Sequence, residues 1–135
     1  MDQTKREEFW NTLTHFIGIV LSLIGLPLLI FANNNLSSFS LASILFFEFG
    51  LLFVYISSTL YHYVENVELK KKLRTLDHIS IFYLIAGSYA PVCLITLYHH
   101  SGIEIFIIVL TIMLIGTFFK LFYTGKYENL SLFLY

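Results

Sequence analysis

One segment decides the fold: SSTLYHYVENVELKKKLRTLDHISIFYLIAGSYAP, residues 57–91, in which a basic stretch separates two apolar runs. Apolar runs of this kind recur along the 135-residue chain, which is 57% hydrophobic and only 13% charged. A soluble domain ordinarily carries about 25% charged residues. The composition therefore indicates an integral membrane protein.

Four apolar runs are long enough to cross a hydrocarbon core of about 30 Å, which takes about 20 helical residues. We expect these spans near residues 15–31, 40–61, 79–97 and 103–123. Only helices or closed barrels satisfy their backbone in lipid, and these uninterrupted runs lack the alternation of barrel strands. The prediction is an all-α, polytopic membrane helix bundle that forms one domain over residues 1–135.

The basic residues predict the orientation of this bundle. All eight Lys and Arg fall in the N-terminal tail, in the expected loop KKKLR or at the end of the fourth span, whereas the connections ANNNLSS and YHHSG carry none. By the positive-inside rule, the N-terminus is expected in the cytoplasm. A net charge of −1 argues against nucleic acid as a partner, so membrane lipids are the expected partners.

Polar residues gather at the same predicted membrane level. Glu8, Asn11 and His15 follow i, i+3, i+7 spacing, and Ser58 and His62 are an i, i+4 pair, so each set shares a helix face. An Asp-His pair opens the third span. Imidazole and carboxylate are zinc-ligand types, and a catalytic zinc takes three protein ligands and a water. Taken singly, these residues could instead be headgroup contacts, helix caps or topology signals.

Three segments then carry a resemblance: EEFWNTLTHFIGIVLSLIGL, SSTLYH and LDHISIFYLIAGSYAP. In this order and at these separations they resemble the hemolysin III family of bacterial membrane proteins, which is related to the progestin and adipoQ receptors and more distantly to alkaline ceramidases. The resemblance covers essentially the whole chain. It implies a seven-helix bundle of the bacterial cytoplasmic membrane, with zinc held by a second-span histidine, a third-span aspartate and an H-x-x-x-H pair on the seventh helix.

The resemblance also assigns residues. It implies the following roles: His62 and Asp77 as zinc ligands, Ser58 as a candidate catalytic group beside the metal, and Glu8, Asn11, His15 and His78 as pocket-side residues.

It further implies a fifth span beginning near residues 130–135, with the H-x-x-x-H pair beyond Tyr135. The neighbouring His99 and His100 are expected on the opposite side of the membrane and cannot replace that pair. We therefore expect a truncated chain with an incomplete zinc site, low zinc occupancy and a missing C-terminal half as a partner.

Other residues are expected to serve packing. Small residues let helices approach closely in lipid. Glu48, in the second span, is expected to point inward and to be protonated or hydrogen-bonded. Cys93 lies in an apolar run and, as the single cysteine, forms no intrachain disulfide. The expected packing residues are Gly18, Ser22, Gly25, Ala86 and Gly87.

Three functions follow from the resemblance, and the residues leave them open. The first is metal-dependent hydrolysis of a lipid amide, of the alkaline ceramidase kind. The second is cytolysis, which the family name implies, although four uncleaved spans would anchor the protein in the membrane of the cell that makes it. The third is a membrane-lipid sensor without turnover, and an inactive fragment is a further alternative. Whether the chain is an enzyme is therefore undecided by its sequence.

Overall fold

The computed structural model describes residues 4–123, which are helical apart from short connections. The helices are α1 (Lys5–Ala32), α2 (Ser40–Tyr63), α3 (Val67–Pro91), the π-helical segment η1 (Val92–Thr96) and α4 (Gly102–Tyr123). All four long helices, with η1 continuing α3, are long and apolar enough to cross a membrane. The predicted all-α membrane fold is thus confirmed. The fifth span expected near residues 130–135 lies outside the described residues.

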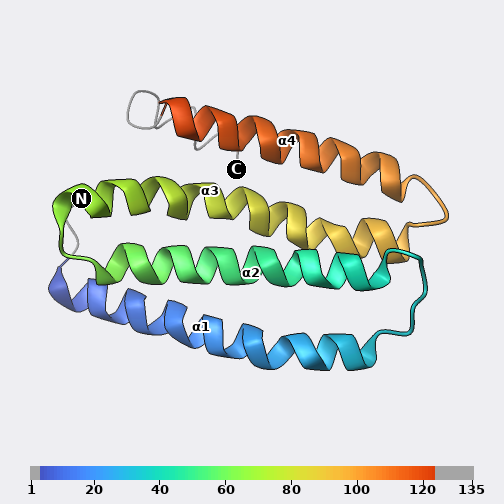
Figure 1. Ribbon diagram of the computed structural model, residues 1–135, viewed down its shortest axis with the longest axis horizontal. Helices are drawn as coiled ribbons and strands as arrows, with labels where there is room; N and C mark the ends of the chain where they lie inside the picture. Colours follow the sequence, from blue (N-terminus) through green and yellow to red (C-terminus); the bar gives the residue numbers. More distant parts are fainter. Residues whose placement is uncertain (1–3, 124–135) are drawn as a thin grey trace.

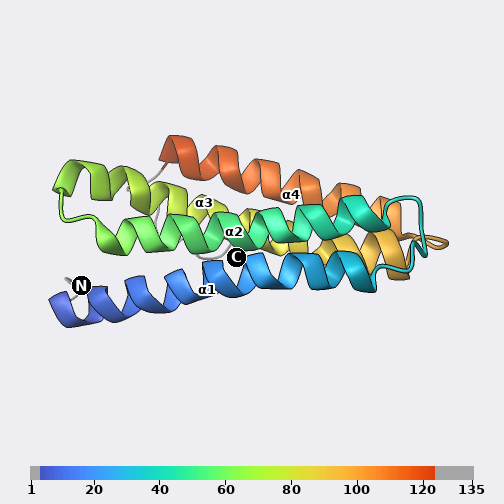
Figure 2. The same ribbon diagram turned by 60° about the horizontal axis from the view of Figure 1, so that its bottom comes forward.

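The helices stand side by side in chain order, each running opposite to the one before (Figures 1 and 2). α2 packs along both α1 and α3, and α4 packs along α3 and η1. The Lys5 end of α1, the Tyr63 end of α2 and the Val67 end of α3 meet on the left of Figure 1. We call this end of the bundle the basic end.

Two helices begin earlier than hydropathy predicts, because capping residues start them. Thr4 accepts a hydrogen bond from the Glu7 backbone N–H, and the Glu7 side chain accepts one from the Thr4 N–H, which forms a capping box before α1. Asn66 caps α3 by accepting from the Leu69 N–H. The prediction that KKKLR is a loop is therefore wrong, since these residues lie in the first turns of α3.

Small residues bring α2 and α3 close together. A Cβ added at Gly50 would lie 2.7 Å from the backbone oxygen of Tyr83, and one at Gly87 would lie 3.1 Å from that of Phe46. The backbones therefore touch at two levels, in the manner of small-residue membrane interfaces. Ala86, also expected at an interface, is fully buried.

On α1, the packing prediction holds at two positions and fails at a third. A Cβ at Gly18 would meet the Tyr55 ring at 2.6 Å, and Ser22 is buried. At Gly25, by contrast, an added Cβ meets nothing within 4 Å, so this glycine is not a packing position among the described residues. Gly25 lies on a face of α1 that has no close neighbour among the described residues.

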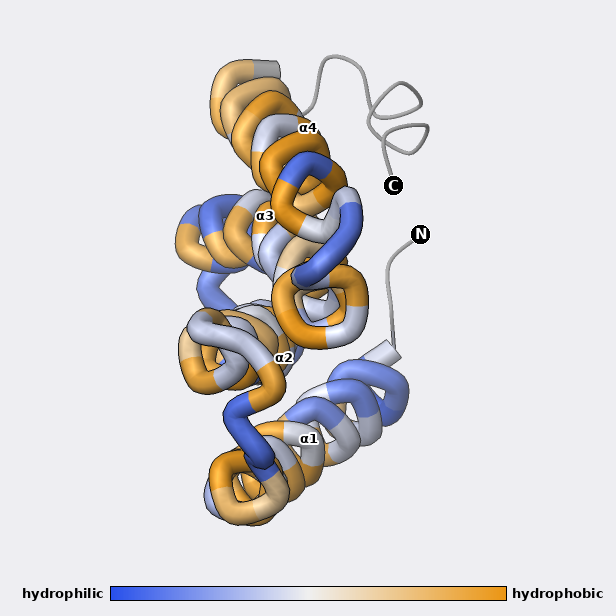
Figure 3. Tube along the Cα trace, turned by 90° about the vertical axis from the view of Figure 1, so that its right-hand side faces the viewer, coloured by the Kyte–Doolittle hydropathy of each residue, from blue (hydrophilic) through white to orange (hydrophobic). Residues whose placement is uncertain are grey.

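Apolar side chains cover the outside of the helices, as a lipid environment favours. Large hydrophobic residues are exposed along α1 and α4, for example Leu21 at 62% and Phe118 at 62%. Figure 3 shows hydrophobic stretches along all four helices and hydrophilic residues mostly at helix ends and connections. This pattern fits helices that face lipid over their middle and water at their ends.

Candidate functional site

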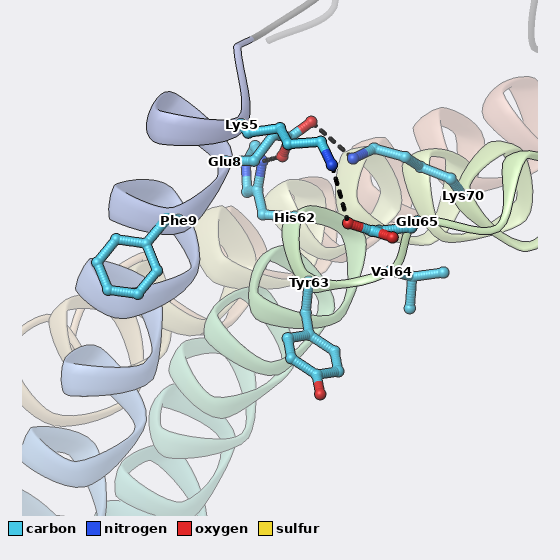
Figure 4. Close-up of a pocket in the computed structure, with 8 residues that line it drawn as sticks. All are labelled: Lys5, Glu8, Phe9, His62, Tyr63, Val64, Glu65 and Lys70. Carbon is cyan, nitrogen blue, oxygen red and sulfur yellow. Dashed lines mark hydrogen bonds and ion pairs between the residues drawn. The ribbon is translucent and has the colours of Figure 1, made fainter.

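The basic end joins three helices through one carboxylate. Glu8 of α1 accepts a hydrogen bond from Nδ1 of His62, on α2, at 2.7 Å, and another from Nζ of Lys70, on α3, at 2.6 Å (Figure 4). The side chains are largely buried, with exposures of 20% for Glu8, 10% for His62 and 26% for Lys70. Partial burial limits the access of water to the ion pair between Glu8 and Lys70, so this pair is stronger than a fully exposed one.

His15 adds a second imidazole to this cluster. Its ring stacks on that of His62, with centroids 5.7 Å apart and planes 5° apart, and it lies 6.2 Å from the ring of Tyr55. Asp77 is hydrogen-bonded to Ser58, which lies about one helical turn before His62 on α2. The three predicted site residues His15, His62 and Asp77 therefore lie in one region, as the sequence pattern predicted.

Ser58 and Asp77 form the second contact of the site. The Ser58 hydroxyl donates a hydrogen bond to Oδ1 of Asp77, which links α2 to α3. The Ser80 hydroxyl donates to the backbone oxygen of Asp77 at 2.6 Å. Asp77 lies about three turns inside α3, so it is not a helix cap. Its side chain instead accepts a hydrogen bond from the neighbouring helix α2.

A pocket of about 640 Å³ opens beside the Glu8 bridge (Figure 4). Two ion pairs border it, that of Glu8 with Lys70 and that of Lys5 with Glu65 at 4.0 Å. The second pair is almost fully exposed. The lining residues are Lys5, Glu8, Phe9, His62, Tyr63, Val64, Glu65 and Lys70.

The other predicted residues occupy different positions. Asn11 and His78 are half-buried on α1 and α3, in the halves of these helices that form the basic end. His99 and His100 are exposed in the connection before α4, at the opposite end of the bundle. Glu48 points inward, as expected, with 3% of its surface exposed, and within residues 4–123 its Oε1 has no hydrogen-bond partner.

The donor set suits zinc in kind but is too small in number. His62 and Asp77 offer an imidazole nitrogen and a carboxylate oxygen, both common zinc ligands. However, residues 4–123 contain no group of three His, Cys, Asp or Glu side chains placed to hold a metal ion. A catalytic zinc takes three protein ligands. The described part of the chain therefore does not complete such a site by itself.

Lys70 was not singled out from the sequence, although a signal was present. It precedes Asp77 by seven residues, which is about two turns of helix, so both lie on the same face once α3 is known to begin at Val67. The Asn66 cap and the helix-forming residues after it indicated that start. If KKKLR is taken as a loop, Lys70 and Asp77 have no helical relation to each other.

The sequence has recognisable relatives. Residues 3–135 match the family model described as Haemolysin-III related. The chain is 38% identical over 133 residues to the Hemolysin-3 homolog of Bacillus subtilis (strain 168), which covers 98% of this chain and 62% of that protein. It is 33% identical over 132 residues to the Hemolysin-3 of Bacillus cereus, covering 97% and 60%. No solved structure matches it. The chain thus spans about 60% of the length of these relatives.

Proposed function

Because the chain belongs to the haemolysin-III related family, we propose that its basic end forms part of a zinc-dependent site that hydrolyses a lipid amide. The observation that carries the proposal is the hydrogen bond from Ser58 to Asp77, one helical turn from His62 on α2. Two potential ligands and a hydroxyl are thereby held by rigid helices, as a catalytic site requires. The choice of an amide substrate rests on the resemblance to alkaline ceramidases.

In this proposal the chain's own residues hold and orient. His62 and Asp77 would be ligands, and Ser58 fixes the direction of the Asp77 carboxylate. A bound zinc supplies hydroxide near neutral pH by acidifying a water. The further ligands would come from residues outside 4–123. The adjoining pocket would receive the polar part of a lipid, with its chains in the membrane.

Zinc content tests the metal part of the proposal. The full chain is purified in lipid nanodiscs, dialysed against a zinc buffer, and its zinc per chain is measured by mass spectrometry. We expect little zinc in the native chain, as for an incomplete site, and less still in His62→Ala and Asp77→Ala. The matched control is His99→Ala, which removes an exposed histidine at the opposite end. Equal zinc in the native chain and in His62→Ala would overturn the metal assignment.

Amide hydrolysis needs its own assay. The native chain in nanodiscs is incubated with a ceramide, and released fatty acid is measured with and without a zinc chelator. The proposal predicts weak release, as for a site with low zinc occupancy, and both the chelator and Ser58→Ala should reduce it. Release that persists in the chelator would rule out the zinc-dependent reaction.

We also propose that the basic end faces the cytoplasm. All eight Lys and Arg fall in segments predicted on one side of the membrane, and the positive-inside rule makes that side cytoplasmic. Single cysteines replacing Lys5 and His99, in a Cys93→Ser background, are exposed to a membrane-impermeant thiol reagent in intact cells. We expect only the His99 position to react. Reaction at the Lys5 position alone would reverse the topology.

Cytolysis is a second candidate, because the matched relative of Bacillus cereus is named Hemolysin-3. The test is release of haemoglobin from erythrocytes after addition of the purified chain, with a denatured sample as control. Lysis that depends on the folded protein would favour cytolysis over hydrolysis in the producing membrane.

A further inference from the structure

The Glu8 carboxylate lies between a lysine and a histidine from two other helices. Each of its oxygens has one donor: Oε1 accepts from Lys70 Nζ and Oε2 accepts from His62 Nδ1. An ionised carboxylate accepts hydrogen bonds and donates none. The proton of the contact with His62 must therefore sit on Nδ1 of the imidazole.

This contact decides which nitrogen of His62 is available. In a neutral imidazole one nitrogen carries the proton and the other accepts a proton or binds a metal. With the proton on Nδ1, the accepting nitrogen is Nε2. The stacked ring of His15 also restricts rotation of the His62 ring, because the planes are only 5° apart. The ring is thus held in both tautomer and orientation.

Lys70 holds the carboxylate that does this. Its ammonium group contacts Glu8 at 2.6 Å and lies 5.2 Å from the centre of the Tyr61 ring. The adjacent Lys71 pairs with Glu68 within α3, and these side chains are 70% and 81% exposed. The two neighbouring lysines therefore differ in role. Lys70 joins three helices, whereas Lys71 forms a surface ion pair that contributes little to stability.

We propose that Glu8 and Lys70 are positioning residues for His62, which fix the Nδ1–H tautomer and present an unprotonated Nε2 to the site. Groups that hydrogen-bond the second nitrogen of a functional histidine commonly orient it in this way. The inference rests on the proposed function only in treating His62 as a site residue. The tautomer itself is a property of the cluster and can be measured without metal or substrate.

Solid-state nitrogen NMR of the full chain in lipid bilayers tests the proposal. The chain is labelled with nitrogen-15 histidine, studied at mildly alkaline pH without metal, and the His62 signals are assigned by their loss in His62→Gln. Free histidine favours the Nε2–H form, whereas we expect His62 to be predominantly Nδ1–H. Glu8→Ala and Lys70→Met should shift it toward Nε2–H, and Lys70→Arg should preserve Nδ1–H. The control, Lys71→Met, should leave the signals unchanged.

The outcomes separate this inference from the proposed function. Predominant Nε2–H in the native chain, or equal shifts in Lys70→Met and Lys71→Met, would overturn the positioning role whatever the zinc content is. The predicted tautomer in a chain that binds no zinc would uphold the positioning role while removing the metal function. If both hold, Glu8→Ala should lower zinc affinity about 10- to 100-fold.

Discussion

The two ends of the bundle join their helices by different means. At the basic end, Glu8 links His62 and Lys70 through charged contacts that cross three helices. At the opposite end, the contacts between helices involve the backbone: the Ser37 hydroxyl, for example, donates to the backbone oxygen of Leu94. The comparison separates an end whose helices are joined by charged side chains from an end whose helices are joined by close backbone packing, which we call the packed end. Substitutions should therefore change stability through side-chain volume at the packed end and through charge at the basic end.

The largest effect is expected at the packed end, from Gly102→Ala. A Cβ there would collide with the backbone oxygens of Cys93 and Leu97, which cannot turn away as a side chain could. We expect a loss of about 3 kcal/mol in the free energy of unfolding, measured by SDS titration in mixed micelles. The control is Gly25→Ala, where nothing lies within 4 Å and the helix preference of Ala gives a gain of up to about 1 kcal/mol. Similar changes in both variants would contradict a shape-determined end.

At the basic end, Glu8→Ala should be next in size. It removes the acceptor of both His62 and Lys70 and leaves a partly buried ammonium group without its carboxylate. The expected loss is about 2 kcal/mol, from the same titration. Glu65→Ala breaks an ion pair with Lys5 that is almost fully exposed, so it should cost less than about 0.5 kcal/mol. If the two glutamate variants unfold alike, the Glu8 bridge is not a structural link.

The adjacent serines of α2 offer a finer test of cross-helix bonding. Ser58 donates to Asp77 on α3, whereas Ser57 donates at 2.6 Å to the Phe53 carbonyl of its own helix. Ser58→Ala should cost about 1.5 kcal/mol, because Asp77 loses a donor, and Ser57→Ala less than about 0.5 kcal/mol. Thermal unfolding in nanodiscs would reveal the difference. A larger effect of Ser57→Ala would mean that the α2–α3 contact depends on packing there too.

The smallest effect is expected between the two ends, at Glu48. Its buried Oε1 lacks a hydrogen-bond partner within residues 4–123, so Glu48→Leu should raise the free energy of unfolding by about 1 kcal/mol. Glu104→Leu, at an exposed position in the first turn of α4, is the control and should change it by less than about 0.5 kcal/mol. Destabilisation by Glu48→Leu would contradict this expectation and would indicate a stabilising polar interaction of the Glu48 carboxyl group.

The fold class was predictable because the apolar runs by themselves indicate membrane-spanning helices. The span expected near residues 15–31 lies within α1, which begins at Lys5, and all but the last residue of the span expected near 79–97 lie within α3 and η1, which begin at Val67. Hydropathy could not find those starts, since the first turns of both helices are charged. The capping residues Thr4 and Asn66 are the signals that could have found them.

The site was predictable as a gathering of residues but not as a set of contacts. The span ends and the positions of the basic residues predict that Ser58, His62 and Asp77 share one membrane level. They could not show that Ser58 bonds to Asp77 or that Glu8 bonds to His62, because those pairings depend on how each helix is rotated about its axis. Rotation is set by contacts such as the Tyr55 ring against Gly18, which join residues far apart in the sequence.

The short connection at residues 64–66 has a consequence for biogenesis. Ser58 and Asp77 are 19 residues apart in the chain, whereas the Glu8 contacts span 54 and 62 residues. As the nascent chain leaves the ribosome, the α2–α3 hairpin can form its polar contact locally, since contacts close in sequence close the smallest loops. The Glu8 contacts close larger loops, so loop entropy makes them the more costly contacts to form.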